Sequence, residues 1–279
     1  ESFLTFDNVT VENTKVTTVT STAISVSSRK GNTKLAIQNS TFVSNVGPNL
    51  LRDGKYYNYN LNQCNEDIED VSSKTQELGQ TSLIKLEGFK TSRLELSNNR
   101  FQDNEAFAYG TIVFCDNCRL IDSGSIFIGN KSSFQGGVFY AMRGSTIELT
   151  KSIFINNYAV DAGGVGVVSN FSTMTVSGIH AELNGIWSSK PTAGSTEEEE
   201  EEEEEGNSEP KEYDWYITWQ GGLFQVTTGS EITIEGVEGA RTLSNNFAYS
   251  GAITYMDASR VGNSTLKNLE VANNRGIIG

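Results

Sequence analysis

The sequence predicts an all-β protein, a right-handed parallel β-helix (β-solenoid) with about 27 residues per coil. A glycine followed by a short apolar run recurs at spacings of 27, 27, 58, 29 and 25 residues, at Gly110, Gly137, Gly164, Gly222, Gly251 and Gly276. A Phe-x-x-Asn tetrad recurs in phase with these glycines. Thr, Ile, Val and Phe are plentiful and only three prolines are present, which favours strands over helices. Short strands repeated with this period are typical of a solenoid in which each period is one coil.

The Phe-x-x-Asn tetrads predict two columns of stacked side chains along the rod. Phe101 stands between Arg100 and Gln102, so its ring is expected to face the core while its neighbours face solvent. The asparagine falls where the strand must bend, and stacked Asn amides can hydrogen-bond along the rod. We therefore expect a structural phenylalanine stack and a structural asparagine ladder, formed by Phe42, Phe101, Phe127 and Phe154 and by Asn45, Asn104, Asn130 and Asn157.

A second inward column is expected two residues after each repeat glycine. Its predicted members are Ile112, Phe139, Phe224 and Ile253, and Gly166 interrupts it in one coil. The glycine itself allows a backbone conformation that other residues resist. Each repeat is therefore predicted to contain a strand, a bend at the asparagine, a glycine and the next strand.

Two insertions are predicted to leave the rod from one edge. Residues 47–78 follow the bend at Asn45, and residues 185–218 follow the bend at Asn184. In solenoids, such insertions map to loops on one face, often the binding face. The first contains three candidate ligand-contact tyrosines, which pack against the rod in the alternative interpretation: Tyr56, Tyr57 and Tyr59.

Composition and charge exclude some classes of partner. The net charge is 21 − 35 = −14, and nine of the negative charges form the run 197–205. An acidic chain argues against nucleic acid, and no apolar stretch reaches the length of about 20 residues that a transmembrane helix needs. The Glu run is expected to be disordered and to associate at most loosely with calcium, so no metal or other cofactor is predicted. We interpret residues 1–279 as a single solenoid segment of a longer chain.

The three cysteines leave the disulfide pattern open. Cys115 and Cys118 lie in one predicted turn, and Cys64 lies in the first insertion. A disulfide within the turn and a disulfide from Cys64 to either turn cysteine are the alternatives. A zinc site would need a fourth ligand, and the single histidine, His180, is predicted to lie two coils away.

Five Asn-x-Ser/Thr sequons are present, a number that chance alone gives at this composition. Four are expected to project from turns or outer faces and to carry N-linked glycans: Asn8, Asn39, Asn170 and Asn263. The fifth, Asn130, belongs to the predicted ladder and is expected to stay bare.

No catalytic residues are predicted. The sequence lacks the Asn-Thr-Asp, Asp-Asp, Gly-His-Gly and Arg-Ile-Lys motifs of pectin-degrading β-helix enzymes. Three carboxylates are expected on the exposed surface, where they could meet across coils and do acid–base chemistry: Asp103, Asp122 and Asp161. A periodic fold also places such pairs by accident, so we predict that the chain is not an enzyme.

The pairing of Phe-x-x-Asn with Gly-Gly-(Ala/Val/Leu) resembles the repeats of the chlamydial polymorphic outer membrane proteins. Similar right-handed β-helix repeats occur in large surface proteins of ciliates and other protists. The resemblance covers roughly residues 33–279 apart from the insertions, and it implies surface display, adhesion or a structural role. The Glu run and the degenerate glycine pair in half of the coils depart from the pattern.

The leading functional interpretation is a non-enzymatic structural segment of an extracellular or cell-surface glycoprotein. As a rigid rod it could stack head-to-tail with other copies or neighbouring segments, because uncovered coil ends expose strand edges. The first alternative is an adhesin or carbohydrate-binding module that contacts surface proteins or carbohydrate through the inserted loops. The second is a polysaccharide lyase or hydrolase.

Overall fold

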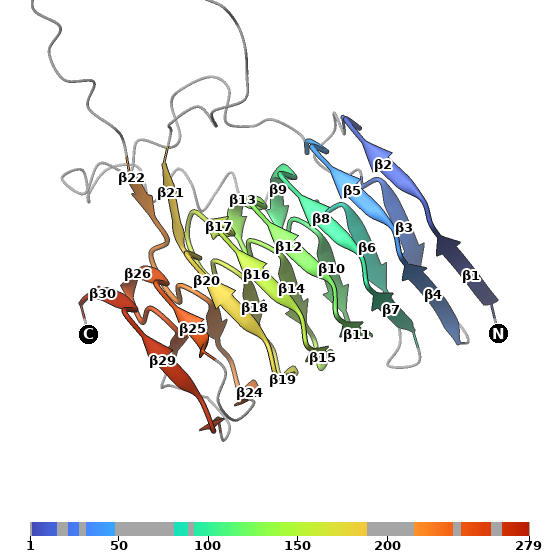
Figure 1. The fold of residues 1–279 in the computed structure, drawn as a ribbon. Helices are drawn as coiled ribbons and strands as arrows, with labels where there is room; N and C mark the ends of the chain where they lie inside the picture. Colours follow the sequence, from blue (N-terminus) through green and yellow to red (C-terminus); the bar gives the residue numbers. More distant parts are fainter. Residues whose placement is uncertain are drawn as a thin grey trace, which may run out of the picture.

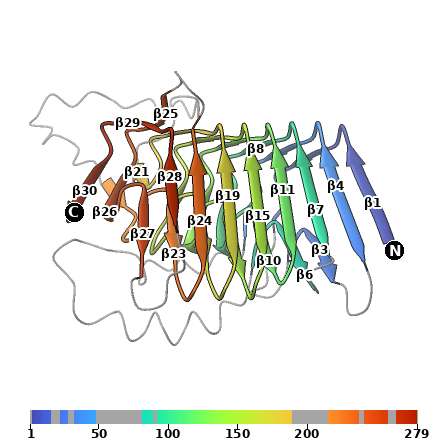
Figure 2. The same ribbon diagram turned by 90° about the horizontal axis from the view of Figure 1, so that it is seen from below.

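The computed structural model describes residues 2–15, 22–27, 32–47, 81–88, 92–188, 215–236, 241–257 and 264–278. These residues form an all-β parallel solenoid, and they contain no helix. The coils follow one another along a rod from the N-terminal to the C-terminal end (Figures 1 and 2). The predicted fold class, a parallel β-solenoid, is therefore confirmed.

Two eight-stranded parallel sheets run along the rod. Sheet 1 consists of β1 (Ser2–Asp7), β4 (Thr33–Gln38), β7 (Arg93–Ser97), β11 (Arg119–Ser123), β15 (Thr146–Thr150), β19 (Thr173–Ser177), β24 (Glu231–Glu235) and β28 (Thr265–Lys267). Sheet 2 consists of β2 (Thr10–Glu12), β5 (Thr41–Val43), β8 (Arg100–Gln102), β12 (Ile126–Ile128), β16 (Ile153–Ile155), β20 (His180–Glu182), β25 (Arg241–Ser244) and β29 (Glu270–Ala272).

Two further sheets close each coil. Sheet 3 has β9 (Glu105–Tyr109), β13 (Lys131–Gln135) and β17 (Tyr158–Ala159) in one part, and β26 (Phe247–Ser250) and β30 (Arg275–Ile278) in another. Sheet 4 has β3 (Ile24–Ser27), β6 (Ile84–Glu87), β10 (Val113–Asp116), β14 (Phe139–Met142), β18 (Gly166–Val168), β23 (Phe224–Val226) and β27 (Thr254–Met256). The chain visits the sheets in the order 1, 2, 3, 4 in each coil.

Register between coils follows the sequence repeat. In sheet 1 the stacked residues Leu94, Leu120, Ile147 and Met174 are consecutive partners, and the interval between them is 26 or 27 residues. Alternate side chains point inward, as strand geometry requires. The core is therefore a set of parallel columns of apolar side chains, each running along the rod.

The phenylalanine column shows this packing most clearly. The ring centroids of Phe42 and Phe101 are 4.9 Å apart, and those of Phe101, Phe127 and Phe154 follow at intervals of 5.1 Å, all in stacked geometry. All four rings are almost completely buried. The 5 Å interval matches the spacing of hydrogen-bonded strands, so backbone pairing and ring stacking reinforce each other.

The predicted second column is wrong by one residue at two of its positions. Phe139 pairs with Val113 rather than Ile112, and Phe224 pairs with Thr254 rather than Ile253. Gly110 is equivalent to Gly136, the first glycine of the pair Gly136–Gly137. Both have a positive φ, +61° and +70°. The predicted column instead aligns Gly110 with the second glycine of the pair, Gly137, and is therefore one residue out of phase. The interruption at Gly166 is present, between Phe139 and Phe224.

The second insertion begins and ends as a two-stranded antiparallel ribbon, β21 (Ile186–Ser188) with β22 (Trp215–Ile217). It starts directly after Asn184. The described residues before the first insertion end at Gly47, two residues after Asn45, which occupies the same corner. Both insertions thus depart just after the corner between sheets 2 and 3, and the second insertion lies in the chain between the two parts of sheet 3.

Candidate functional site

The corner between sheets 2 and 3 holds a continuous ladder of asparagine side chains. Asn130 is representative: its Oδ1 accepts hydrogen bonds from Nδ2 and the backbone N–H of Asn104, at 2.9 and 3.3 Å. Its Nδ2 donates to Oδ1 of Asn157 at 3.0 Å and to the carbonyl of Phe101 at 3.1 Å. The buried amide therefore makes all four hydrogen bonds expected of it.

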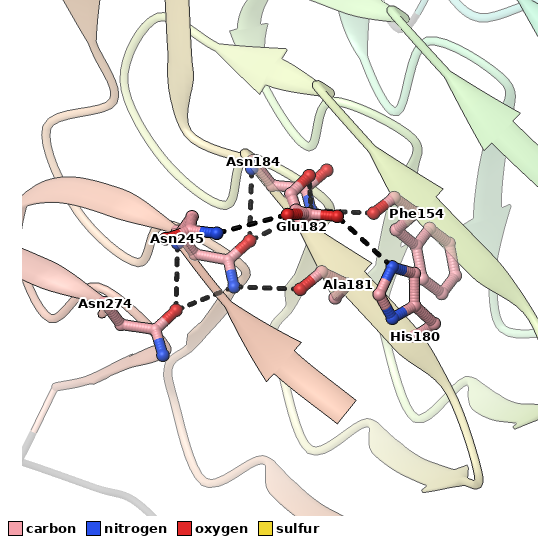
Figure 3. Close-up of polar contacts among 8 residues, drawn as sticks. Phe154, His180, Ala181, Glu182, Asn184, Asn245 and Asn274 are labelled. Carbon is pink, nitrogen blue, oxygen red and sulfur yellow. Dashed lines mark hydrogen bonds and ion pairs between the residues drawn. The ribbon is translucent and has the colours of Figure 1, made fainter. Parts of the chain in front are cut away.

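The same arrangement continues from Asn45 to the C-terminal end of the described rod, while the first coil has Thr14 at the ladder position and only its backbone N–H bonds to Asn45. Asn45, Asn104, Asn130 and Asn157 are joined in order, and Asn184, Asn246 and Asn274 extend the ladder toward the C-terminal end. Figure 3 shows this end, where Nδ2 of Asn184 donates to the carbonyl of Phe154 at 2.9 Å. A fully satisfied polar column stabilises the bend and leaves no free group for chemistry.

Sequence reasoning missed a second polar ladder at the corner between sheets 4 and 1. Backbone N–H groups of Cys118, Ser145 and Ser172 donate to the hydroxyls of Ser145, Ser172 and Ser230 in the next coil, at 3.1 to 3.2 Å. The signal was present, because each of these serines stands two residues before an inward residue of sheet 1. Cys118 takes the serine position in its own coil.

An aromatic and acidic cluster lies where the outer faces of sheets 3 and 4 meet. The ring of Tyr109 contacts Phe134 and Tyr140 edge-on, with centroids 5.3 and 5.0 Å apart. Nε2 of Gln135 donates to Oδ2 of Asp161 at 2.6 Å. These residues come from three successive coils and are partly exposed. We call Tyr109, Phe134, Gln135, Tyr140 and Asp161 the junction cluster.

The titratable groups of the junction cluster all have raised pKa values. Burial raises the pKa of Asp161, although the hydrogen bond from Gln135 opposes this. Burial, and to a lesser extent the charge of Asp161, raises the pKa of Tyr109. Burial also raises the pKa of Tyr140. Raised pKa values make the two phenols harder to ionise and the carboxyl a stronger base than a free one, and all three groups can take part in hydrogen bonds.

A second aromatic pair stands next in line along sheet 3. The rings of Trp219 and Tyr249 are stacked with centroids 4.2 Å apart, and both residues are partly exposed. Nearby, Nε2 of Gln225 donates to Oε1 of Gln220 at 2.7 Å. Trp219 follows the second insertion directly, so this pair and the junction cluster lie on the side of the coil that the insertions interrupt.

The three carboxylates expected on the surface do not meet. Only Asp103 is exposed. Asp122 is completely buried and pairs in register with Leu96 and Leu149, so the expectation that it is exposed is wrong. The physical reason is strand alternation, which turns both Leu120 and Asp122 inward. Burial raises the pKa of Asp122 to about 6, opposed by hydrogen bonds from Ser125 and Ser152.

The sequon asparagines differ in environment. Asn8 and Asn39 are exposed, and Nδ2 of Asn39 donates to Oδ1 of Asp7 at 3.1 Å. Asn170 is partly exposed. Asn130 is buried in the ladder, where both N–H bonds of its amide are used. Asn263 lies outside the described residues.

The structure describes the two turn cysteines and His180 but not the candidates of the two insertions. Cys115 and Cys118 form a disulfide across the turn after β10. Nε2 of His180 lies 3.5 Å from Oε2 of Glu182 on sheet 2, in a partly exposed position (Figure 3). Tyr56, Tyr57, Tyr59, Cys64 and the Glu run lie outside the described residues. Among the residues that are described, no group of three His, Cys, Asp or Glu side chains could hold a metal ion, and no helix could cross a membrane.

The fold, the columns and the two polar ladders define a parallel β-solenoid protein. Comparison of the chain with protein families, curated proteins and solved structures gives no match.

Proposed function

We propose that this chain is a non-enzymatic structural segment of an extracellular surface or filament-forming glycoprotein, in which the rigid rod associates head-to-tail. The observation that carries the proposal is the match between its two ends. The inward columns stay open at both ends of the described rod, with Leu4 52%, Leu266 53% and Val271 48% exposed.

The two ends are complementary in register. Leu266 continues the inward column that begins at Phe6, and Val271 continues the column that begins at Val11. The asparagine ladder is open as well, because Asn274 is its last described member and partly exposed. A second copy stacked in register would extend the strands and cover these side chains.

The test is self-association of the chain in solution. Sedimentation equilibrium over a hundredfold concentration range, with electron microscopy of the concentrated sample, should show linear assemblies that lengthen with concentration. The double variant Leu266→Lys with Val271→Lys should stay monomeric, because it places charge in the joined columns. A monomer at every concentration in the parent chain would contradict head-to-tail association.

The matched control changes an exposed apolar residue on the side of the rod. Leu183 is 43% exposed at φ +56°, and Asn156 and Asn245 occupy the equivalent position in the coils on either side. Leu183→Asn should therefore leave assembly unchanged. Loss of assembly in this control would assign the contact to the side of the rod and not to its ends.

The glycoprotein part of the proposal concerns four sequons, Asn8, Asn39, Asn170 and Asn263. Secretion of the chain from an N-glycosylating host, followed by peptide mass spectrometry, should find glycans among these sites. Asn130 should be bare, because a glycan would remove amide N–H donors that the buried ladder uses. A glycan on Asn130 in the folded protein would contradict the buried ladder.

A second candidate function is carbohydrate binding, as an adhesin or binding module. The observation that favours it is the line of partly exposed aromatic and amide side chains formed by the junction cluster and the Trp219–Tyr249 pair. Such side chains pack on and hydrogen-bond to sugars. If this surface binds carbohydrate, the chain should bind glycans on an array. Trp219→Ala should weaken that binding at least tenfold, and Leu183→Asn should leave it unchanged. Hits that both variants leave unchanged would exclude this surface.

A further inference from the structure

One corner of the rod contains an unusual residue. Between sheets 4 and 1, three successive coils turn through two left-handed residues: Arg143 and Gly144, then Asn170 and Phe171, then Thr228 and Gly229. Backbone hydrogen bonds place Gly144, Phe171 and Gly229 at equivalent positions, because the N–H of Gly144 donates to Asn170 and that of Phe171 to Thr228. A phenylalanine therefore stands where both neighbouring coils have glycine.

The conformation of Phe171 is unfavourable for its side chain. Its φ is +61°, a region that bulky L-residues rarely adopt and that glycine adopts freely. Folding does not explain the residue, because the side chain is 70% exposed and lies outside the buried core. A strained residue with an exposed aromatic ring is a reason to look for a contact that the ring makes with something else.

The residue before Phe171 belongs to a sequence motif for N-linked glycosylation. Asn170, Phe171 and Ser172 form a sequon, and Asn170 is partly exposed. The hydroxyl of Ser172 accepts the N–H of Ser145 at 3.1 Å and the N–H of Ser172 donates to Ser230 at 3.1 Å, so the serine ladder fixes this corner. Phe171, with its exposed ring, thus directly follows in the chain the asparagine to which a sugar would be attached.

We propose that Asn170 carries an N-linked glycan whose first N-acetylglucosamine packs on the ring of Phe171. This inference rests on the proposed glycoprotein function. The new bond joins Nδ2 of Asn170 to the anomeric carbon of a lipid-diphosphate-linked oligosaccharide supplied by the secretory pathway. The lipid diphosphate leaves, and an amide proton passes to the transferase. Ser172 is buried in the folded rod, so the transfer takes place before this corner folds.

The ring and the sugar match chemically. The C–H face of a pyranose is weakly positive and the face of an aromatic ring is negative, so the two attract while apolar area leaves water. The other described surface sequons have no aromatic residue in the middle position: Val9 follows Asn8, and Ser40 follows Asn39. A glycan on Asn170 is thus expected to be ordered, whereas glycans on Asn8 and Asn39 are not held by a ring.

The test compares bare and glycosylated protein, with and without the ring. The chain is produced in bacteria and in a secreting eukaryotic host, and glycans of the latter are trimmed to a single N-acetylglucosamine by an endoglycosidase. Site occupancy is read by mass spectrometry, and NMR tests for contacts between the sugar protons of Asn170 and the Phe171 ring. The sugar should raise the melting temperature of the parent chain by about 2 °C or more.

The variant Phe171→Gly restores the residue that both neighbouring coils use, so it should fold. Without sugar it should melt at or above the temperature of the bare parent, since strain is relieved. The sugar should then raise its melting temperature much less than that of the parent. The matched control is Asn39→Asp, which removes a sugar that has no adjacent ring and should leave the effect of the Phe171 substitution unchanged.

The outcomes separate the two proposals. Absence of glycans from every sequon would overturn the glycoprotein function and this inference together. Glycans on Asn8 or Asn39 with Asn170 bare would overturn the inference alone. The same holds for a sugar on Asn170 that makes no contact with the ring and stabilises the parent and Phe171→Gly equally.

Discussion

Nδ2 of Asn104 donates a hydrogen bond to Oδ1 of Asn130, 2.9 Å away in the next coil, and both side chains are completely buried. Each of these amides also bonds to backbone groups of adjoining coils. The ladder therefore joins each coil to the coils before and after it through bonds that water cannot replace.

Removal of one amide from the middle of the ladder should be costly. Asn130→Ala leaves at least two buried partners unsatisfied, at about 1–3 kcal/mol each. The free energy of unfolding, measured by denaturant titration, should fall by about 3 kcal/mol or more. Asn274→Ala is the control, because Asn274 is partly exposed at the end of the described ladder and its loss should cost about half as much. Equal losses would contradict a ladder in which burial determines the cost.

The phenylalanine column should contribute a large part of the free energy of unfolding that comes from the core. Phe127 is buried and contacts the rings of Phe101, Phe139 and Phe154. Phe127→Ala should lower the free energy of unfolding by about 3–5 kcal/mol. Phe3→Ala, at a ring that is 65% exposed beside Lys34, should cost less than about 1 kcal/mol in the same denaturation experiment. A small loss for Phe127→Ala would mean that the column is not tightly packed.

Asp122 should make the stability of the rod depend on pH. Its pKa is about 6 in the folded chain and about 3.9 in an unfolded one, so the folded state binds the proton more tightly. The stabilisation is complete below about pH 4 and is lost as pH rises through about 6, a difference of about 3 kcal/mol at neutral pH. Asp122→Asn, which cannot ionise, should lack this decline when thermal or denaturant unfolding is followed from pH 4 to 8.

Ser152 provides a check on the direction of this effect. Its hydroxyl donates to Oδ2 of Asp122 and stabilises the ionised form. Ser152→Ala should therefore move the decline in stability to higher pH. A decline at the same pH in Asp122→Asn as in the parent would assign the titration to another group.

The disulfide should be largely replaceable by residues from the neighbouring coils. Cys115 stacks between Leu86 and Ala141, and Cys118 occupies a serine-ladder position beside Ser145. The double variant Cys115→Ala with Cys118→Ser should therefore fold and lose no more than about 2 kcal/mol, since the closed loop is short. Thermal melts with and without reducing agent check this: reduction should lower the melting temperature of the parent but not of the variant. Failure of the variant to fold would mean that the bond, not the packing, holds this corner.

Much of the architecture can be predicted from the sequence because a solenoid repeats the same local pattern of strands and bends in each coil. An inward residue followed three residues later by an asparagine, as at Phe127 and Asn130, marks a strand and a bend in each coil from Phe42 to Val271, so the pattern of one coil predicts the next. The distance between phenylalanine rings of successive coils and the hydrogen bonds between ladder asparagines both follow from parallel pairing at a fixed strand spacing.

Tertiary structure decided what depends on exact phase. Asp122 looks like a surface carboxylate in the sequence, but the register with Leu96 and Leu149 places it inside. The junction cluster is equally hidden in the sequence, because Tyr109, Tyr140 and Asp161 meet only through coil stacking. The sequence by itself determined the repeat, the phenylalanine stack and the asparagine bends, since these are local patterns of inward and outward residues. Only the tertiary structure decided which side chains of different coils share one place, because a one-residue change at a turn, as at Gly110, shifts the partners of the strand that follows it.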